Sequence, residues 1–214
     1  MTPRTEPSSA VRAAILCVLL AMAVTSCDAD TGPEDRSDAP SVTASPSPGT
    51  PAFRFVVHAR RIEATDRARF GNRDRRRVQD VIDTVRGLVT DLYVEGFLDP
   101  AGWGTGDYEP VFGLFAGGAR EAARSRTRAL TAGADAADRF TTIQPAGGGL
   151  WLRALVDRSG AASLVSGIVR FRARADGDEP TLFRSEATYL FRRTGDGWRI
   201  VAFEVVRRDR ERAA

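Results

Sequence analysis

Residues 150–206 read LWLRALVDRSGAASLVSGIVRFRARADGDEPTLFRSEATYLFRRTGDGWRIVAFEVV, and this stretch decides the fold. Apolar and polar side chains alternate in it with a period of two, which is typical of strands that bury one face. Short turns rich in Gly and Asp interrupt the alternation at residues 157–160, 176–178 and 194–197. The pattern predicts four long strands joined by tight turns, which together form an antiparallel four-stranded meander.

The second expected strand shows the two faces of this sheet most clearly. Val165, Val169 and Phe171 fall on one side, together with Gly167 and Ala173, and arginines occupy alternate positions from residue 170 to residue 174 on the other side. The charged side cannot belong to a core, so we expect a solvent face or a docking surface for an acidic partner. Its arginines are expected to be Arg170, Arg172 and Arg174, with Arg184 and Arg192 as neighbours on the next strand.

Upstream of the strands, the apolar period changes to that of a helix. Apolar residues recur at steps of three to five between Val78 and Phe97, which predicts a helix from about Asp74 to Phe97. Asn72 is the expected N-cap, and the pair at 99–100, Asp-Pro, is the expected stop.

The remaining segments of the domain give shorter signals. Glu109-Pro110 predicts the start of a second short helix, and a third is expected around 119–130 after two glycines. Alternation in the segment 53–62 predicts an early strand or an extended arm. The domain from residue 52 to residue 214 is therefore expected to be α+β.

The N-terminus has the order of a secretory signal. Arg4 and Arg12 precede an uncharged apolar run from residue 13 to residue 24, which is too short to span a bilayer, since a spanning helix needs about 20 residues. The run ends in Val24-Thr25-Ser26-Cys27, which resembles the lipobox of bacterial lipoproteins. That resemblance implies cleavage after residue 26, a diacylglyceryl group on Cys27, and a protein anchored by lipid on the extracytoplasmic face of the cell membrane.

Residues 27–51 differ from the rest of the chain in composition. They are mostly Asp, Ser, Thr, Pro and Gly, with few apolar residues, and they carry five acidic residues against one arginine. Such a stretch cannot bury enough apolar surface to offset the entropy of ordering it, so we expect a disordered linker between the lipidated cysteine and the domain.

Composition excludes several classes of chemistry. All 31 basic residues are arginine, so no Schiff-base lysine and no phosphate-binding lysine of a Walker loop is present. His58 is the only histidine, and the lipidated mature chain would keep no free thiol. We therefore expect no metal site and no cofactor. Nucleic acid is not an expected partner of an extracytoplasmic protein, although the net charge is +3.

Helices followed by a meander whose last strand opens Gly195-Asp-Gly-Trp-Arg-Ile200 resemble the nuclear transport factor two-like superfamily, which includes SnoaL-like proteins. The chain is also similar to Mce-associated and other lipoproteins of that superfamily in actinobacteria. The resemblance covers residues 73–208 and implies a cone, with N-terminal helices packed in the concave face of a curved sheet. It also implies a pocket at the open end of the cone.

Enzymes of that superfamily use a pocket carboxylate as a base beside a Tyr or Asp donor. The weak candidates for such a role are Glu186, Glu204, Tyr189 and Asp91. Because Glu186 shares its face with Arg184 and Arg192, ion pairing is an equal explanation, and no catalytic residue is assigned.

A group of arginines opens the long helix, where positive charge opposes the helix dipole. Positive charge at this unfavourable position suggests that the arginines contact an anion or a phospholipid. The residues are Arg73, Arg75, Arg76 and Arg77.

These observations favour a membrane-anchored, non-catalytic lipoprotein whose domain binds a partner protein or a small apolar ligand. Two alternatives stay open: an isomerase- or cyclase-like enzyme that uses a pocket carboxylate, and a structural module of the cell envelope that forms a homodimer through its sheet. A pocket filled by Trp103, Phe112 or Phe115 would count against the enzyme.

Overall fold

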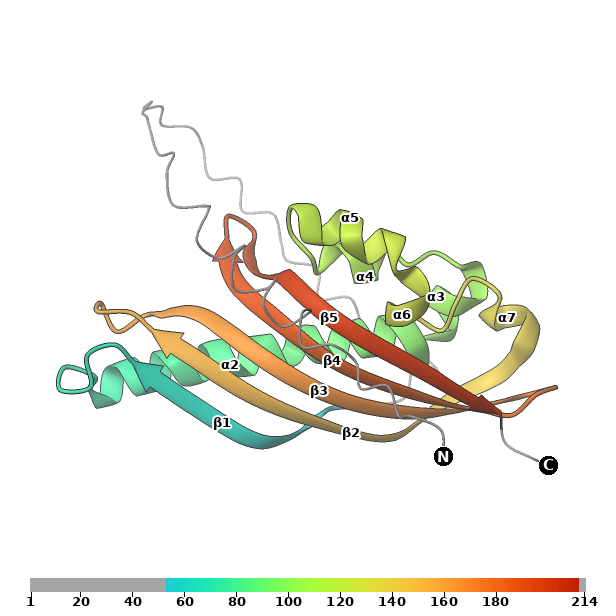
Figure 1. Cartoon of the computed structure of the whole chain (residues 1–214), viewed down its shortest axis with the longest axis horizontal. Coiled ribbons are helices and arrows are strands. Elements are labelled where there is room, and N and C mark those ends of the chain that lie inside the picture. The colour runs from blue at the N-terminus through green and yellow to red at the C-terminus, as the bar shows by residue number, and fades with distance from the viewer. Residues whose placement is uncertain (1–52, 212–214) are drawn as a thin grey trace, which may run out of the picture. The chain divides into compact units, whose positions relative to one another are not determined.

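The computed structural model describes residues 53–211, which form an α+β arrangement of one mixed five-stranded sheet and several helices (Figure 1). The strands lie in the order β1-β2-β3-β4-β5. Neighbouring strands from β2 to β5 pair antiparallel, so the predicted meander is confirmed. The expected leader, Cys27 and linker lie outside the described residues. The strands are β1 (Val56–Ala64), β2 (Phe140–Val156), β3 (Ala162–Gly177), β4 (Thr181–Thr194) and β5 (Gly197–Glu211).

The segment that was expected to be a strand or an extended arm forms the strand β1, which adds a fifth strand to the expected four-stranded sheet. It pairs with β2 in parallel, from Val56 opposite Gly149 to Ala64 opposite Val156. No turn in the sequence indicates this pairing, because paired residues of the two strands are about 90 positions apart in the chain and parallel strands need a long crossover connection. The crossover here consists of the helices between β1 and β2.

The strand β2 begins at Phe140, ten residues before the expected start at Leu150. Its first half contains Pro145 and the glycine run 147–149, and the pairing with β3 shifts register between Pro145 and Gly147. Proline and glycine are depleted in strands, so this half carries no alternating signal.

The long helix α2 (Asn72–Tyr93) follows the prediction with two differences at its ends. The N-cap is Gly71 and not Asn72, and the backbone N–H of Gly71 donates to the Asp74 carboxylate at 3.1 Å. After Tyr93 the chain continues as a π-helix, η1 (Val94–Leu98), which ends at Asp99 as expected. A side chain at Gly96 would lie 2.6 Å from the carbonyl oxygen of Leu130, so glycine is required where the two segments cross.

Five short helices complete the crossover and gather beside β5 (Figure 1). The helix expected at Glu109 is confirmed, and the one expected at 119–130 is divided at Arg126 into two. The sequence analysis missed the first and last of the five. They are α3 (Pro100–Thr105), α4 (Glu109–Gly113), α5 (Gly118–Ser125), α6 (Thr127–Leu130) and α7 (Ala136–Arg139).

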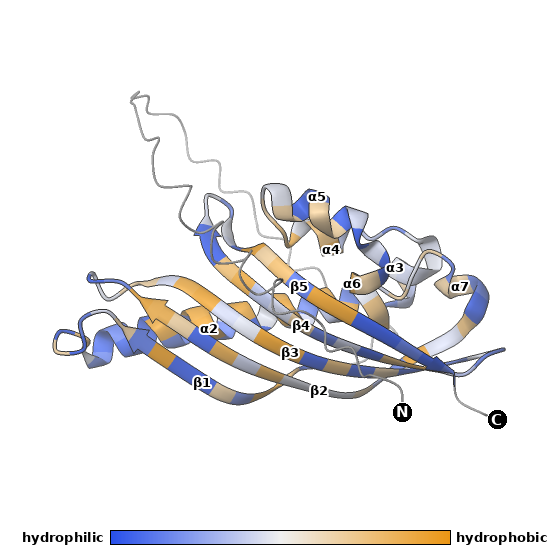
Figure 2. Cartoon of the chain, in the orientation of Figure 1, coloured by the Kyte–Doolittle hydropathy of each residue, from blue (hydrophilic) through white to orange (hydrophobic). Residues whose placement is uncertain are grey.

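The helices cover one face of the sheet, which we call the inner face; the opposite face is the outer face. Aromatic rings fill the inner side: the ring centroid of Phe171 lies 4.7 Å from that of Tyr93, 5.4 Å from Phe97 and 5.6 Å from Phe53. The strands alternate in hydropathy along their length, and the end of β5 is strongly hydrophilic (Figure 2). Buried and exposed residues therefore follow the predicted period of two.

Candidate functional site

The inner side of the sheet is lined by buried side chains, many of them aromatic. Trp103, Phe112 and Phe115 are all among the buried residues of the core. The hydroxyl groups of Tyr93 and Tyr189 lie 3.3 Å apart, and that of Tyr93 lies 3.0 Å from the Ser185 hydroxyl. Burial raises the pKa of both tyrosines. Because the hydroxyl groups have hydrogen-bond partners, the two side chains form a satisfied polar pair inside the core.

The two candidate carboxylates of the strands lie on the outer face. Ser185 points into the core, so Glu186, the next residue, points to solvent. Glu204 lies opposite Thr188 on the neighbouring strand, diagonally from Glu186. Both glutamates line a shallow hollow of about 170 Å³ that also includes Ile168 and Val206. The structure thus brings the two glutamates together, but it separates them from Tyr189 by the thickness of the sheet.

The candidate Asp91 lies on neither strand face. It is exposed near the end of α2, and partial desolvation raises its pKa above the usual value. Its neighbour one turn on, Glu95, has a raised pKa because of desolvation, with smaller contributions from the negative charges of Asp99 and Asp91. No described group of three or more His, Asp or Glu residues is close enough to hold a metal ion.

The arginines at the start of α2 are exposed and lie at the end of the sheet near the β2–β3 turn, since Asp74 approaches Gly160. Arg75 lies over the Phe70 ring at 5.9 Å. Within residues 53–211 none of the four arginines has an acidic partner within 4 Å. They are Arg73, Arg75, Arg76 and Arg77.

Five arginines gather on the outer face at the other end of the sheet, and we call them the arginine cluster. Arg172 on β3 lies directly opposite Arg184 on β4, which in turn lies directly opposite Arg208 on β5. Arg174 and Arg210 occupy the next row, on either side of Leu182. Each of the five is exposed, and no carboxylate of the described chain lies within 4 Å of them.

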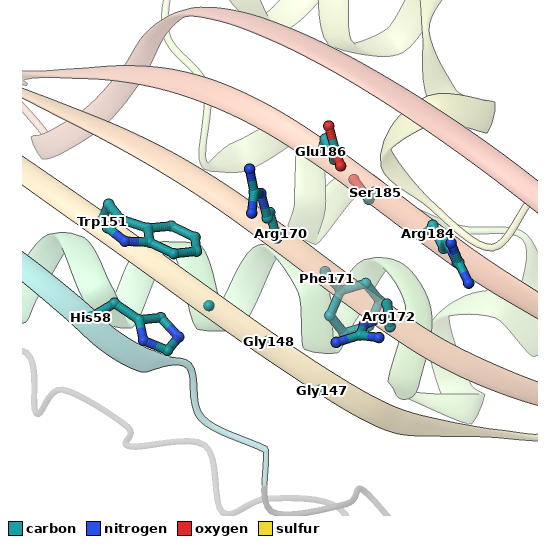
Figure 3. Close-up of a pocket in the computed structure, with 11 residues that line it drawn as sticks. His58, Gly147, Gly148, Trp151, Arg170, Phe171, Arg172, Arg184, Ser185 and Glu186 are labelled. Atoms are coloured by element: carbon teal, nitrogen blue, oxygen red, sulfur yellow. The ribbon is translucent and has the colours of Figure 1, made fainter.

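A groove of about 470 Å³ adjoins the arginine cluster on the outer face (Figure 3), and we call it the outer groove. Its floor is the glycine run 147–149. One side is formed by Trp151, whose ring stacks on the His58 ring with the two centroids 4.8 Å apart. The guanidinium carbon of Arg170, on the neighbouring strand β3, lies 5.4 Å from the centroid of the Trp151 ring. The remaining lining residues are Phe171, Arg172, Arg184, Ser185 and Glu186.

The glycines keep this floor open. A side chain at Gly149 would lie 2.9 Å from the His58 ring, and one at Gly148 would lie 2.8 Å from the Phe53 ring. Gly147 has φ +135, a backbone conformation that side chains rarely adopt. A side chain at Gly149 would therefore fill the groove beside His58, whereas the absence of one at Gly148 leaves room for the core ring of Phe53 on the inner face.

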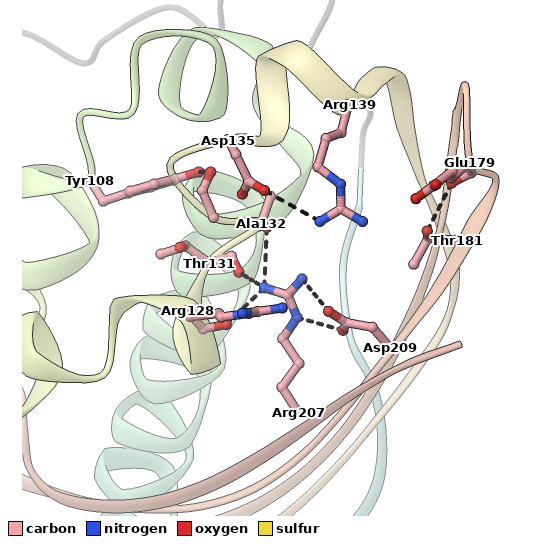
Figure 4. A network of polar contacts seen from close by, with 11 residues as sticks. Tyr108, Arg128, Thr131, Ala132, Asp135, Arg139, Glu179, Thr181, Arg207 and Asp209 are labelled. Atoms are coloured by element: carbon pink, nitrogen blue, oxygen red, sulfur yellow. Dashed lines mark hydrogen bonds and ion pairs between the residues drawn. The ribbon is translucent and has the colours of Figure 1, made fainter. Parts of the chain in front are cut away.

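Arg207 on β5 shows a different use of arginine. Its side chain is only 6% exposed and donates to the backbone carbonyls of Arg128, Thr131 and Ala132 (Figure 4). It also forms a paired contact with Asp209 and lies over the Phe183 ring at 4.4 Å. Because these carbonyls belong to α6 and to the two residues that follow it, Arg207 fastens the C-terminal end of α6 to the last strand.

The sequence analysis identified part of this site. It placed Arg170, Arg172 and Arg174 outward and named Arg184 as a neighbour, and all of this is confirmed. Arg192 is not part of the group, because it pairs with Arg199 near the opposite end of β4. Arg208, Arg210, Trp151 and the glycine floor were missed; the glycine run was the signal that could have indicated them.

Within residues 53–211, no helix has the length and apolar character needed to cross a membrane. No known protein family, curated protein or solved structure matches the chain, so its candidate site stands on its own geometry.

Proposed function

We propose that this chain is a membrane-anchored, extracytoplasmic lipoprotein whose domain is a non-catalytic binding module of the SnoaL-like cone type. In this proposal Cys27 carries the lipid, the segment 27–51 links it to the domain, and the outer face of the sheet docks an acidic partner protein. The α+β order of helices before a meander supports the cone, and the lipobox-like residues 24–27 support the anchor.

The observation that carries the binding function is the arginine cluster. Like charges directly opposite one another on adjacent strands destabilise a sheet by about 0.2–1 kcal/mol a pair. Arg172, Arg184 and Arg208 form two such pairs in one row, and no described carboxylate lies within 4 Å of them. A partner with complementary carboxylates removes that repulsion, which makes the row a favourable place for an acidic surface.

The packed interior supports binding over catalysis. A base for proton abstraction needs a nearby donor for the developing oxyanion. Glu186 and Glu204 face solvent, whereas the hydroxyl of Tyr189 is used inside the core. The three groups do not form one site.

The docking proposal is tested with the full chain in detergent and poly-L-glutamate as an acidic probe. Charge reversal at three outer positions, Arg174→Glu, Arg208→Glu and Arg210→Glu, should weaken binding at least about tenfold, and added salt should weaken wild-type binding. The matched control replaces the same three residues by lysine, which keeps the charge. Equal affinity of the wild-type and charge-reversed chains would contradict the proposal.

The anchor is tested separately by Cys27→Ala. Removing the sulfur that would carry the lipid should release the protein from the membrane fraction and block its maturation after residue 26. A variant that fractionates and matures as the wild type does would rule out the lipid anchor.

A homodimer is a second candidate, because two large apolar residues are exposed on the outer face, on the strands that flank β4. Ile168 is 52% exposed and Val206 is 47% exposed, and both line the hollow beside Glu186 and Glu204. Burying them against a second copy would stabilise a dimer. Analytical ultracentrifugation of the full chain in detergent should show a dimer that Ile168→Glu disrupts; a monomer at high concentration would exclude it.

A further inference from the structure

We infer that the outer groove is a binding site for a phosphorylated polyol, such as a sugar phosphate. This inference goes beyond the proposed docking function, since it concerns a small ligand and needs neither the acidic partner nor the lipid anchor. It shares only Arg172 and Arg184 with the arginine cluster.

The end of the groove beside the arginine cluster fits a phosphate group. Arg172 and Arg184 lie directly opposite each other on neighbouring strands, and both line the groove (Figure 3). Neither has an acidic partner within the described part of the chain. Each guanidinium group can donate two parallel hydrogen bonds to the oxygens of a phosphate that lies between the two side chains. Binding would also relieve their mutual repulsion.

The other end fits a hydroxyl-bearing body. Glu186 lies directly opposite Arg170, and both line the groove, so one carboxylate acceptor and one further donor are available for hydroxyl groups. Trp151 is in contact with His58 and Arg170, and the part of its ring that lines the groove offers apolar surface for the carbon skeleton of a sugar. The groove thus combines polar and apolar groups, as a sugar does with its hydroxyl groups and its carbon ring.

The floor and the size of the groove suit a small ligand. No side chain rises into the groove from Gly147 or Gly149, so a ligand can approach the strand backbone closely. The volume of about 470 Å³ falls in the range of about 300–1,000 Å³ that is usual for small-molecule sites. A hexose phosphate can be held there with its phosphate toward Arg172 and its ring toward Trp151.

Calorimetry on the full chain in detergent tests the inference with three probes: glucose 6-phosphate, inorganic phosphate and glucose. Glucose 6-phosphate should bind at least about tenfold more tightly than either of the other two, because only it uses both ends of the groove. Equal affinity for glucose 6-phosphate and inorganic phosphate would overturn the assignment of the ring end.

Three variants assign the two ends. Arg172→Ala should weaken glucose 6-phosphate and inorganic phosphate alike, by about tenfold or more, since each loses a charged hydrogen-bonding partner. Trp151→Ala should weaken only glucose 6-phosphate. Arg210→Ala, outside the groove, is the control and should leave both affinities unchanged. Retained binding in Arg172→Ala, in a chain with the unfolding midpoint of the wild type, would overturn the inference.

A vesicle experiment distinguishes a soluble ligand from a lipid head group of the same chemistry. The full chain is reconstituted into phosphatidylcholine vesicles with and without phosphatidylglycerol, and glucose 6-phosphate binding is repeated. If the head group is a source, phosphatidylglycerol should reduce the apparent affinity by competition, and Arg172→Ala should remove that reduction. Unchanged affinity would assign the site to a soluble ligand. Failure of poly-L-glutamate to bind would affect only the docking proposal.

Discussion

Consecutive residues on β3 lie on opposite faces of the sheet and in very different surroundings. Phe171 packs against four aromatic rings on the inner face, whereas Arg172 lies on the outer face beside other arginines. Packing on the inner face stabilises the fold, whereas the arginines on the outer face repel one another and do not contribute to its stability. The difference supports the proposal that the domain binds its partner through the outside of its sheet.

The sharpest test of this contrast removes a ring from the inner face. Phe171→Ala should lower the free energy of unfolding by about 3–5 kcal/mol, because it leaves a cavity inside the aromatic cluster. Urea denaturation followed by circular dichroism measures the loss. Ile168→Ala, on the outer face of the same strand, is the control and should change stability far less. A small loss at Phe171 would break the contrast.

A second test compares two neighbouring arginines on β5. Arg207→Met keeps an apolar stem near Phe183 but removes the donors to the three helix-end carbonyls and to Asp209, so stability should fall by about 2–3 kcal/mol. Arg208→Met, which changes an exposed member of the arginine cluster, should cost little. Thermal and urea unfolding of both variants give the comparison, and equal losses would contradict it.

The third test concerns repulsion on the outer face. Arg184→Ala removes the central charge of the row formed with Arg172 and Arg208, so stability at low salt should rise by about 0.2–1 kcal/mol. The gain should shrink at high salt, since screening weakens the repulsion. Arg153→Ala is the matched control: Arg153 bonds Glu63, so its loss should bring no gain. A destabilised Arg184→Ala variant would argue against unrelieved repulsion.

The smallest effect is expected at Glu95 in η1, outside both sheet faces. Its pKa is raised in the folded chain, so ionisation disfavours folding, and its destabilising effect appears as the pH rises above the unfolded pKa. Glu95→Gln should stabilise the domain at neutral pH by about 0.2–0.5 kcal/mol, as expected for removing a like-charge pair with Asp91. The gain should vanish in acid, where wild-type Glu95 is protonated. The test is the unfolding midpoint of the wild-type and Glu95→Gln chains, measured across pH. A difference between the two midpoints that does not change with pH would contradict the prediction.

The sequence predicted the faces of the strands better than their partners. The alternation around Phe171 depends only on local period, so inward and outward residues could be assigned correctly. The row of Arg172, Arg184 and Arg208 depends on register, which turn geometry and bulges set, and the expectation for Arg192 was wrong for that reason. The outer groove combines β1 to β4, so His58 and Trp151 could not be placed together before the parallel pairing was known.

The parallel pairing of β1 also bears on how the chain folds. The hairpins of β2 to β5 close over short turns, whereas β1 must meet β2 across about 90 residues, at a larger cost in loop-closure entropy. We expect β1 to join last in refolding kinetics. Until it does, the edge of β2 at Leu150 and Leu152 is open to the wrong strand, so the slow step of folding is also the one most exposed to aggregation.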